Sequence, residues 1–254
     1  MNDTNPSNTV SSAGSSFPAT MWTLVMKTRD DSDPQAQQKI LDKLCRAYWT
    51  PLFHYAQRKG NPVEKAKDLT QGFFLNLLEK ELFGKADREK GKLRTLLLTA
   101  FSFYIGNEHD KTIAQKRGGG ELTLSLDWLD ESGESYEIEN ADHATPETLY
   151  EKSCALATLM GAASSLEQKY VTAGKLPFFT SLRQFITVGG DAETYGIEAE
   201  KLGIRGDYYK VLVQRFRKEF KEALEENVRE TLPEGATGDE VKEEIMYLIR
   251  LAYS

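Results

Sequence analysis

The most informative stretch of the chain is residues 194–220, TYGIEAEKLGIRGDYYKVLVQRFRKEF. Its residues Ala199, Leu202, Gly203 and Ile204 have the small-residue, apolar and turn-glycine spacing of a helix-turn-helix. Apolar residues then recur at helical spacing from Leu212 through Phe216 and Phe220 to Ala223, which predicts a helix with a buried stripe. Another face of that helix carries Lys210, Gln214, Arg217, Lys218 and Lys221. The pattern predicts a helix with one core face and one basic face.

A plainer interpretation also fits this stretch, namely an ordinary helical hairpin whose basic face is solvated. Glu198 stands where such motifs usually carry an apolar residue, and the turn Arg205-Gly206 is unusual. The pattern favours the helix-turn-helix, whose second helix enters the major groove of DNA. In that arrangement Arg205, Lys210 and Gln214 would reach base edges or phosphates.

The rest of the chain is also helical by its apolar periodicity. Asn61, Pro62 and Glu64 resemble a capping box that starts a helix, and Pro51 is expected to open a separate short helix. No strand-like alternation of useful length occurs, so we expect an all-α protein. The predicted helices are 34–49, a short one from 51, 62–77, 91–117, 146–174, 176–186, 193–202, 207–232 and 239–252.

The amino-acid composition changes along the 254 residues and indicates where domains and linkers begin and end. Three glycines at 118–120 interrupt the helical pattern and indicate a hinge. Residues 121–151 contain ten acidic and no basic residues, which predicts an acidic linker, acting either as a polyanionic tether or as a plain spacer. The predicted parts are a disordered tail (1–16), a first helical domain (17–117), an acidic linker (118–145), a helix-turn-helix domain (146–232) and an amphipathic extension (233–254).

The net charge of −7 conceals two basic regions. Residues 85–117 carry eight basic and four acidic side chains. Residues 205–221 carry six basic and two acidic side chains. Local clusters of Lys and Arg bind phosphate backbones through counterion release, so overall acidity does not exclude DNA.

The first basic region also contains aromatic residues. On its predicted helix, a set of polar residues shares about a quarter of the circumference with Phe103. Phe103 could stack on an unpaired base, or it could pack against a neighbouring helix. The set that shares this face is Lys92, Thr99, Phe103, Asn107, Asp110 and Arg117.

Several classes of protein are disfavoured. His54, His109 and His143 are isolated, and no catalytic or phosphate-binding motif occurs, so we expect neither an enzyme nor a cofactor or metal site. Cys45 and Cys154 are too far apart for a disulfide framework or zinc motif. No run of about 18 apolar residues and no signal peptide is present, which predicts a cytoplasmic protein without membrane insertion.

Three further stretches resemble the first conserved domain of bacterial RNA polymerase sigma factors of the small extracytoplasmic-function group. They are LCRAYWTPLFHYAQRKG (44–60), KAKDLTQGFFLNLLEK (65–80) and KGKLRTLLLTAFSFYIGNEHDKTIAQKR (90–117). Residues 194–225, which begin with TYGIEAEKLGIRGDYYKVLVQRFRKEF, resemble the same family's C-terminal helix-turn-helix domain. The resemblance implies a first domain that binds the polymerase clamp and melts the promoter −10 element, and a second that reads the −35 element.

The resemblance also implies roles for individual residues. It places Asp68, Gln71 and Phe74 against the polymerase clamp, and Tyr104, a candidate for stacking, is expected to be a core residue. The residues implied for the −10 element and melting are Lys92, Arg94, Phe103, Asn107, Asp110, Lys116 and Arg117. Those implied for the −35 element are Arg205, Lys210, Gln214, Arg215, Arg217 and Lys218. The chain departs from the family at Gly72, where an acid is usual, and at Tyr208-Tyr209, where smaller residues are usual.

The expected partners are core RNA polymerase and promoter DNA, and an anti-sigma or other regulatory partner is left open. Two alternatives remain at this point. The chain could be a helix-turn-helix regulator that binds DNA unaided, or a sigma-like protein that binds a partner without reading promoters. The C-terminal extension, with Val241, Ile245, Leu248 and Ile249 on one side, would cover the second domain or regulate it.

Overall fold

The computed structural model describes residues 34–79, 92–114, 144–233 and 235–254. These residues form eight α-helices and one short 3-10 helix and contain no strand, which confirms the predicted all-α class. The predicted tail (1–16), the glycines at 118–120 and nearly all of the acidic linker lie outside the described residues. The elements are α2 (Pro34–Arg58), α3 (Val63–Glu79), α4 (Leu93–Ala114), α6 (Pro146–Thr172), α7 (Leu176–Leu182), η2 (Arg183–Phe185), α8 (Ala192–Lys201), α9 (Gly206–Thr231) and α10 (Gly238–Ala252).

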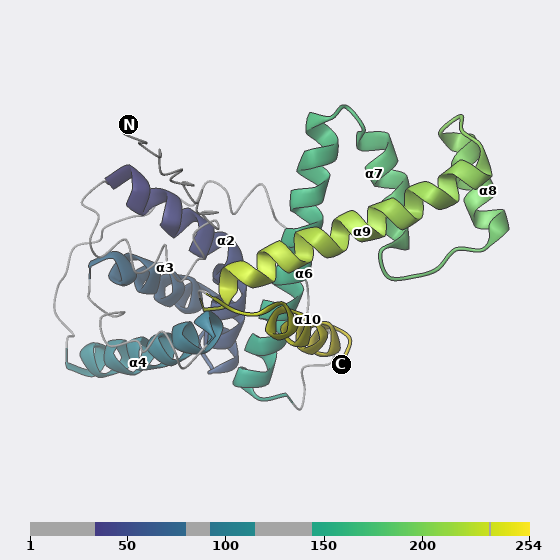
Figure 1. Cartoon of the computed structure of the whole chain (residues 1–254). Coiled ribbons are helices and arrows are strands. Elements are labelled where there is room, and N and C mark those ends of the chain that lie inside the picture. Colours follow the sequence, from purple (N-terminus) through teal and green to yellow (C-terminus); the bar gives the residue numbers. More distant parts are fainter. Residues whose placement is uncertain (1–33, 80–91, 115–143, 234) are drawn as a thin grey trace, which may run out of the picture.

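The helices gather in two lobes that share two long helices (Figure 1). Helices α2, α3 and α4 form one lobe, and α7, η2 and α8 surround the first half of α9 in the other. Helix α6 packs on α2 and on α9, and α10 packs on both α6 and α9 where the lobes meet. The C-terminal helix therefore lies at the junction.

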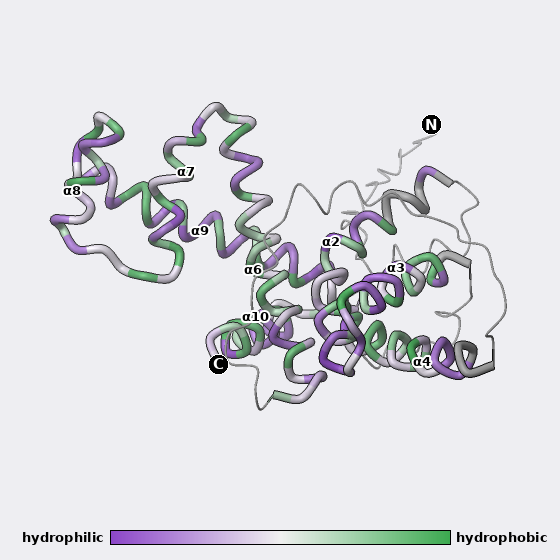
Figure 2. The backbone as a smooth tube through the Cα atoms, turned by 180° about the vertical axis from the view of Figure 1, so that it is seen from behind, coloured by the Kyte–Doolittle hydropathy of each residue, from purple (hydrophilic) through white to green (hydrophobic). Residues whose placement is uncertain are grey.

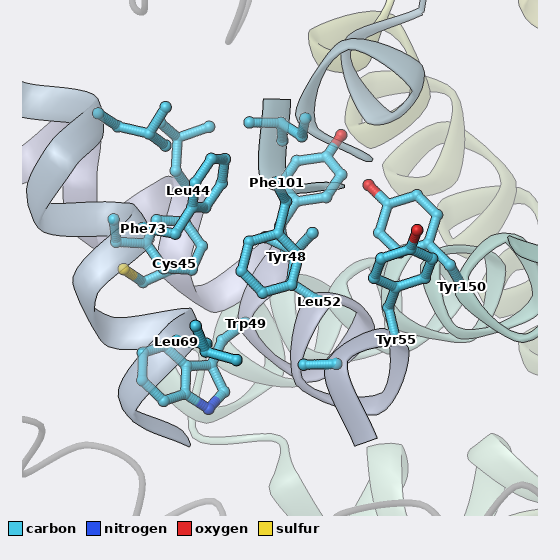
Figure 3. Close-up of a cluster of buried hydrophobic side chains, with 14 of the residues drawn as sticks. Leu44, Cys45, Tyr48, Trp49, Leu52, Tyr55, Leu69, Phe73, Phe101 and Tyr150 are labelled. Atoms are coloured by element: carbon cyan, nitrogen blue, oxygen red, sulfur yellow. The ribbon is translucent and has the colours of Figure 1, made fainter. Parts of the chain in front are cut away.

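An aromatic core holds the first lobe together (Figure 3). The predicted stripe of α3, Ala66, Leu69, Phe73 and Leu77, is buried in it as expected. The ring of Phe73 lies 4.9 Å from that of Phe101 on α4, centroid to centroid. Such aromatic pairs add to the free energy gained by removing apolar surface from water.

Helix α6 belongs to both lobes. Tyr150 and Cys154, near its start, are buried in the core of the first lobe, whereas Leu166, near its end, lies in the core of the second. The predicted domain boundaries place the whole helix in the second domain. Its predicted start is observed, because the Thr145 side chain caps the helix by accepting a hydrogen bond from the Thr148 N–H.

The start of the chain's described part differs from the expectation at two points. Pro51 lies inside one continuous helix α2, because the burial of its neighbours Leu52 and Tyr55 outweighs the hydrogen bond that a proline removes. The Asn61 side chain does not start α3. Its amide instead donates to the Ala56 carbonyl at 2.8 Å and so caps the end of α2.

The helices from α6 onward begin and end within one or two residues of the predicted positions, except that residues 176–186 divide into α7 and η2. Their caps explain the agreement. The Asp191 carboxylate accepts from the Thr194 N–H at 2.8 Å, and Thr237 and Glu240 form a reciprocal capping box. Hydrophobic residues recur between hydrophilic ones along α9 (Figure 2), and its buried residues follow helical spacing. The helix is therefore amphipathic, as predicted.

Candidate nucleic-acid interface

A short turn joins α8 to α9. Gly203 adopts a left-handed backbone conformation (φ +66°), and the Ile204 N–H donates to the Ala199 carbonyl at 3.0 Å to close the end of α8. Ala199 is buried against α9, and a Cβ added to Gly206 would make an ordinary contact with the Gly196 Cα at 3.8 Å. The two helices thus meet across a turn of four residues.

A buried polar network fixes α8 against α9. The Ser181 hydroxyl lies 2.6 Å from a carboxylate oxygen of Glu198 and 2.8 Å from the hydroxyl of Tyr209, which is fully buried. Lys201 donates to the other Glu198 oxygen at 2.6 Å. The hydrogen bonds from Lys201 and Ser181 lower the pKa of Glu198, so the carboxylate stays charged. An acid is therefore accommodated where an apolar residue is usual.

Arg217 belongs to the scaffold of this lobe. Its Nε donates to the Phe185 carbonyl and its Nη2 to the Val188 carbonyl, each at 2.7 Å. Phe185 ends η2 and Val188 follows it, so the guanidinium ties the segment before α8 to α9. Two of the five N–H donors of Arg217 are thus used within the protein, and its implied contact with −35 DNA stays a prediction.

The outer face of α9 is basic and exposed. Arg205 is also exposed, and its guanidinium pairs with Asp207 at 2.8 Å beside the start of α9. Two apolar side chains, Tyr208 and Val211, lie on the exposed surface next to the cations. Such a face can neutralise phosphates and contact base edges. The exposed polar residues on it are Lys210, Gln214, Arg215 and Lys218.

On α4, Phe103 is 72% exposed, so within the described part of the chain it does not pack into a core. Asn107 and Asp110 are exposed on the same helix. Tyr104 is half-buried with its ring 5.8 Å from that of Phe73, as its predicted core role requires. Burial, and then the charge of Glu108, raise the pKa of Tyr104 to about 12. The implied DNA-binding residues Lys116 and Arg117 lie outside the described residues.

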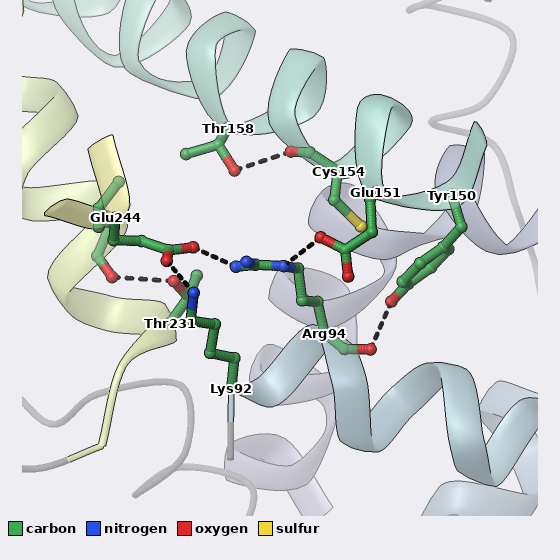
Figure 4. Close-up of polar contacts among 9 residues, drawn as sticks. Lys92, Arg94, Tyr150, Glu151, Cys154, Thr158, Thr231 and Glu244 are labelled. Atoms are coloured by element: carbon green, nitrogen blue, oxygen red, sulfur yellow. Dashed lines mark hydrogen bonds and ion pairs between the residues drawn. The ribbon is translucent and has the colours of Figure 1, made fainter. Parts of the chain in front are cut away.

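Two further residues implied for the −10 element form an ion cluster with the C-terminal helix (Figure 4). Lys92 and Arg94, at the start of α4, both pair with Glu244 of α10, and the Arg94 Nε also donates to Glu151 of α6 at 2.7 Å. The Tyr247 ring lies 4.9 Å from the Lys92 ammonium and 5.3 Å from the Arg94 guanidinium carbon.

The Arg94 side chain is only 7% exposed, so the implied contact between Arg94 and DNA does not fit this conformation. Burial alone would lower the pKa of Arg94, but its bonds to Glu244 and Glu151 outweigh that effect and raise it. Lys92 remains 41% exposed. The cluster therefore has a buried side, formed by Arg94 and Glu244, and a side open to water.

The three residues implied for the polymerase clamp lie in different environments on α3. Asp68 is exposed and Gln71 is half-buried. Phe74 is fully buried and stacks on Trp49 at 5.9 Å, because it extends the apolar stripe of α3 inward. Phe74 is a core residue, which contradicts a direct contact with a partner. Gly72 faces Tyr104, whose hydroxyl a Cβ at that position would overlap.

The structure shows functional candidates that sequence reasoning missed. Ser181 and Glu198 are 17 residues apart, and Arg94 and Glu244 are 150 apart, so local spacing gives no sign of either pair. One signal was available for Glu244. It lies three residues after Val241 and four before Leu248, on the apolar stripe of α10, where an unpaired acid would be costly.

No match to a family model was found for this chain, and neither the curated proteins nor the solved structures gave one. None of the described helices is both long and apolar enough to cross a membrane. Among the residues that the structure describes, no group of three or more His, Cys, Asp or Glu side chains could hold a metal ion. The interface is therefore interpreted from its own chemistry.

Proposed function

We propose that this chain is a sigma factor that binds core RNA polymerase and directs promoter recognition and DNA melting. The observation that carries the proposal is the pair α8 and α9, joined by a tight turn, with a basic and exposed outer face on α9. A helix-turn-helix places such a face in the major groove. Lys210 and Lys218 would neutralise phosphates, and Gln214 and Arg215 would reach base edges.

The first lobe would act on the opened strand. Phe103 projects from α4 as an exposed aromatic ring among polar neighbours, which suits stacking on an unpaired base. Asn107 lies one turn further along the helix and can hydrogen-bond a base edge. Unstacking a base pair costs a few kcal/mol, which contacts of this kind would offset.

A helix-turn-helix regulator that binds DNA unaided is the second candidate. It is favoured by the burial of Phe74 and Arg94, which removes one implied polymerase contact and one implied −10 contact. A sigma-like protein that binds a partner without promoter specificity would share these features.

The candidates differ in whether DNA binding depends on core RNA polymerase. The full chain is added to a bacterial core RNA polymerase with a library of promoter fragments, and promoter-specific runoff transcripts are scored. A sigma factor yields discrete transcripts and binds promoter DNA weakly alone, whereas a regulator binds its site equally well without polymerase. Phe103→Ala should spare the closed complex and reduce permanganate-reactive thymines. Val171→Ala, which also truncates an exposed apolar side chain, serves as the matched control.

A further inference from the structure

The C-terminal helix α10 contacts the first lobe through a buried acid, Glu244, and through the Tyr247 ring. Glu244 has a side chain only 2% exposed, and it receives both Lys92 and Arg94 from the start of α4. The apolar side of α10, through Val241 and Leu248, packs in a separate cluster with α6 and α9. Helix α10 is thus fastened by apolar contacts to the shared helices and by charge to α4.

The charged contact is not the most stable way to fasten a helix. Burying a carboxylate and a guanidinium costs desolvation, and well-packed apolar residues in their place often give equal or greater stability. A carboxylate does, however, resemble a phosphate in its charge and in its acceptor oxygens. Because Lys92 is 41% exposed, an anion from solution can approach the cluster from that side.

Two carboxylates balance the charge of the two cations in the cluster. Glu151 of α6 neutralises one of the two cations, and Glu244 neutralises the other. Without Glu244 the start of α4 would keep two cations against one carboxylate, with the Tyr247 ring also removed from them. An undocked α10 therefore leaves a net positive site next to the helix that carries Phe103.

We propose that α10 is an autoinhibitory helix, in which Glu244 occupies Lys92 and Arg94 in place of nucleic-acid phosphates. Phosphates of DNA compete with Glu244 for these cations, and α10 leaves α4 when DNA binds there. The proposal rests on the proposed function, because it requires α4 to face DNA. It predicts that α10 and DNA exclude each other at the start of α4.

The test measures the affinity of the full chain for a fluorescein-labelled 20-base-pair duplex by anisotropy at several salt concentrations. Glu244→Gln keeps the shape of the side chain and removes its charge. Glu243→Gln removes the same charge from an exposed neighbour on α10 and controls for net charge. Glu244→Gln should bind at least about fivefold more tightly than Glu243→Gln, as expected for allosteric coupling, with a steeper salt dependence. Adding Lys92→Gln to Glu244→Gln should remove most of this gain.

A second route undocks α10 without changing any charge. Leu248→Ala, at a buried position, weakens the apolar contacts of α10 and should also tighten DNA binding. In the parent protein, DNA should increase amide hydrogen exchange in α10, while circular dichroism checks that each variant stays folded. If the parent binds duplex DNA but Glu244→Gln and Leu248→Ala bind no more tightly than Glu243→Gln, autoinhibition is refuted and the proposed function stands. If no variant binds duplex DNA, either alone or with core RNA polymerase added, both proposals fail.

Discussion

Arg217 and Lys218 are neighbours on α9 in different environments, since Arg217 bonds two backbone carbonyls and Lys218 is exposed. Arg217→Met keeps the aliphatic stem but removes two hydrogen bonds, to the carbonyls of Phe185 and Val188. A hydrogen bond from a charged group contributes about 1.5–3 kcal/mol, and the bond to Val188 is exposed and therefore weaker. We expect the free energy of unfolding to fall by about 2 kcal/mol and the melting temperature by about 4–8 °C.

Lys218→Met removes the same charge one residue later, from an exposed side chain 3.8 Å from Glu222. It should leave the melting temperature nearly unchanged and reduce the slope of log affinity against log salt by about 0.9, the value for one lost phosphate contact. Thermal denaturation and DNA-binding titrations over a range of salt measure both quantities for both variants. An Arg217→Met variant that melts at the parent's temperature, or that alone flattens the salt slope, would contradict these roles.

Three further perturbations test the first lobe by urea denaturation. Phe74→Ala should cost about 3–5 kcal/mol, because it opens a cavity beside Trp49, and an unchanged midpoint would place Phe74 at the surface. Gly72→Ala should cost about 1–3 kcal/mol through overlap with the Tyr104 hydroxyl, and Tyr104→Phe in the same chain should recover part of that loss; no recovery would contradict the overlap. Burial lowers the pKa of His54 below 6.5, so the unfolded chain binds more protons. Stability should therefore fall as the pH drops from about 6.5 toward the lower folded pKa, and His54→Gln should flatten this dependence.

The sequence predicted most of the helices because their signals are local. Thr145 and Asp191 cap helices through side chains that bond the backbone three residues later, and Gly203 takes the left-handed conformation that a short turn requires. At Pro51 the local signal misled, since packing of the neighbouring residues keeps α2 continuous through a residue that usually ends a helix.

The candidate site was predicted less well, because exposure and pairing depend on contacts between distant parts of the chain. Lys210, Gln214, Lys218 and Lys221 are exposed, as the predicted basic face of α9 requires. Arg94 carries the same kind of charge in a similarly basic region, yet Glu244 pairs with it across 150 residues. No spacing rule along one helix can distinguish these two situations.

One end of α6 is buried in the core of the first lobe and the other end in the core of the second, so the helix holds the two lobes at a fixed separation. Its 27 residues span about 40 Å. On the proposed function, inserting one base pair between the two promoter elements shifts them by about 3.4 Å and rotates them by roughly 35°. A rigid helix cannot absorb such a change, so tolerance for spacer length should be narrow.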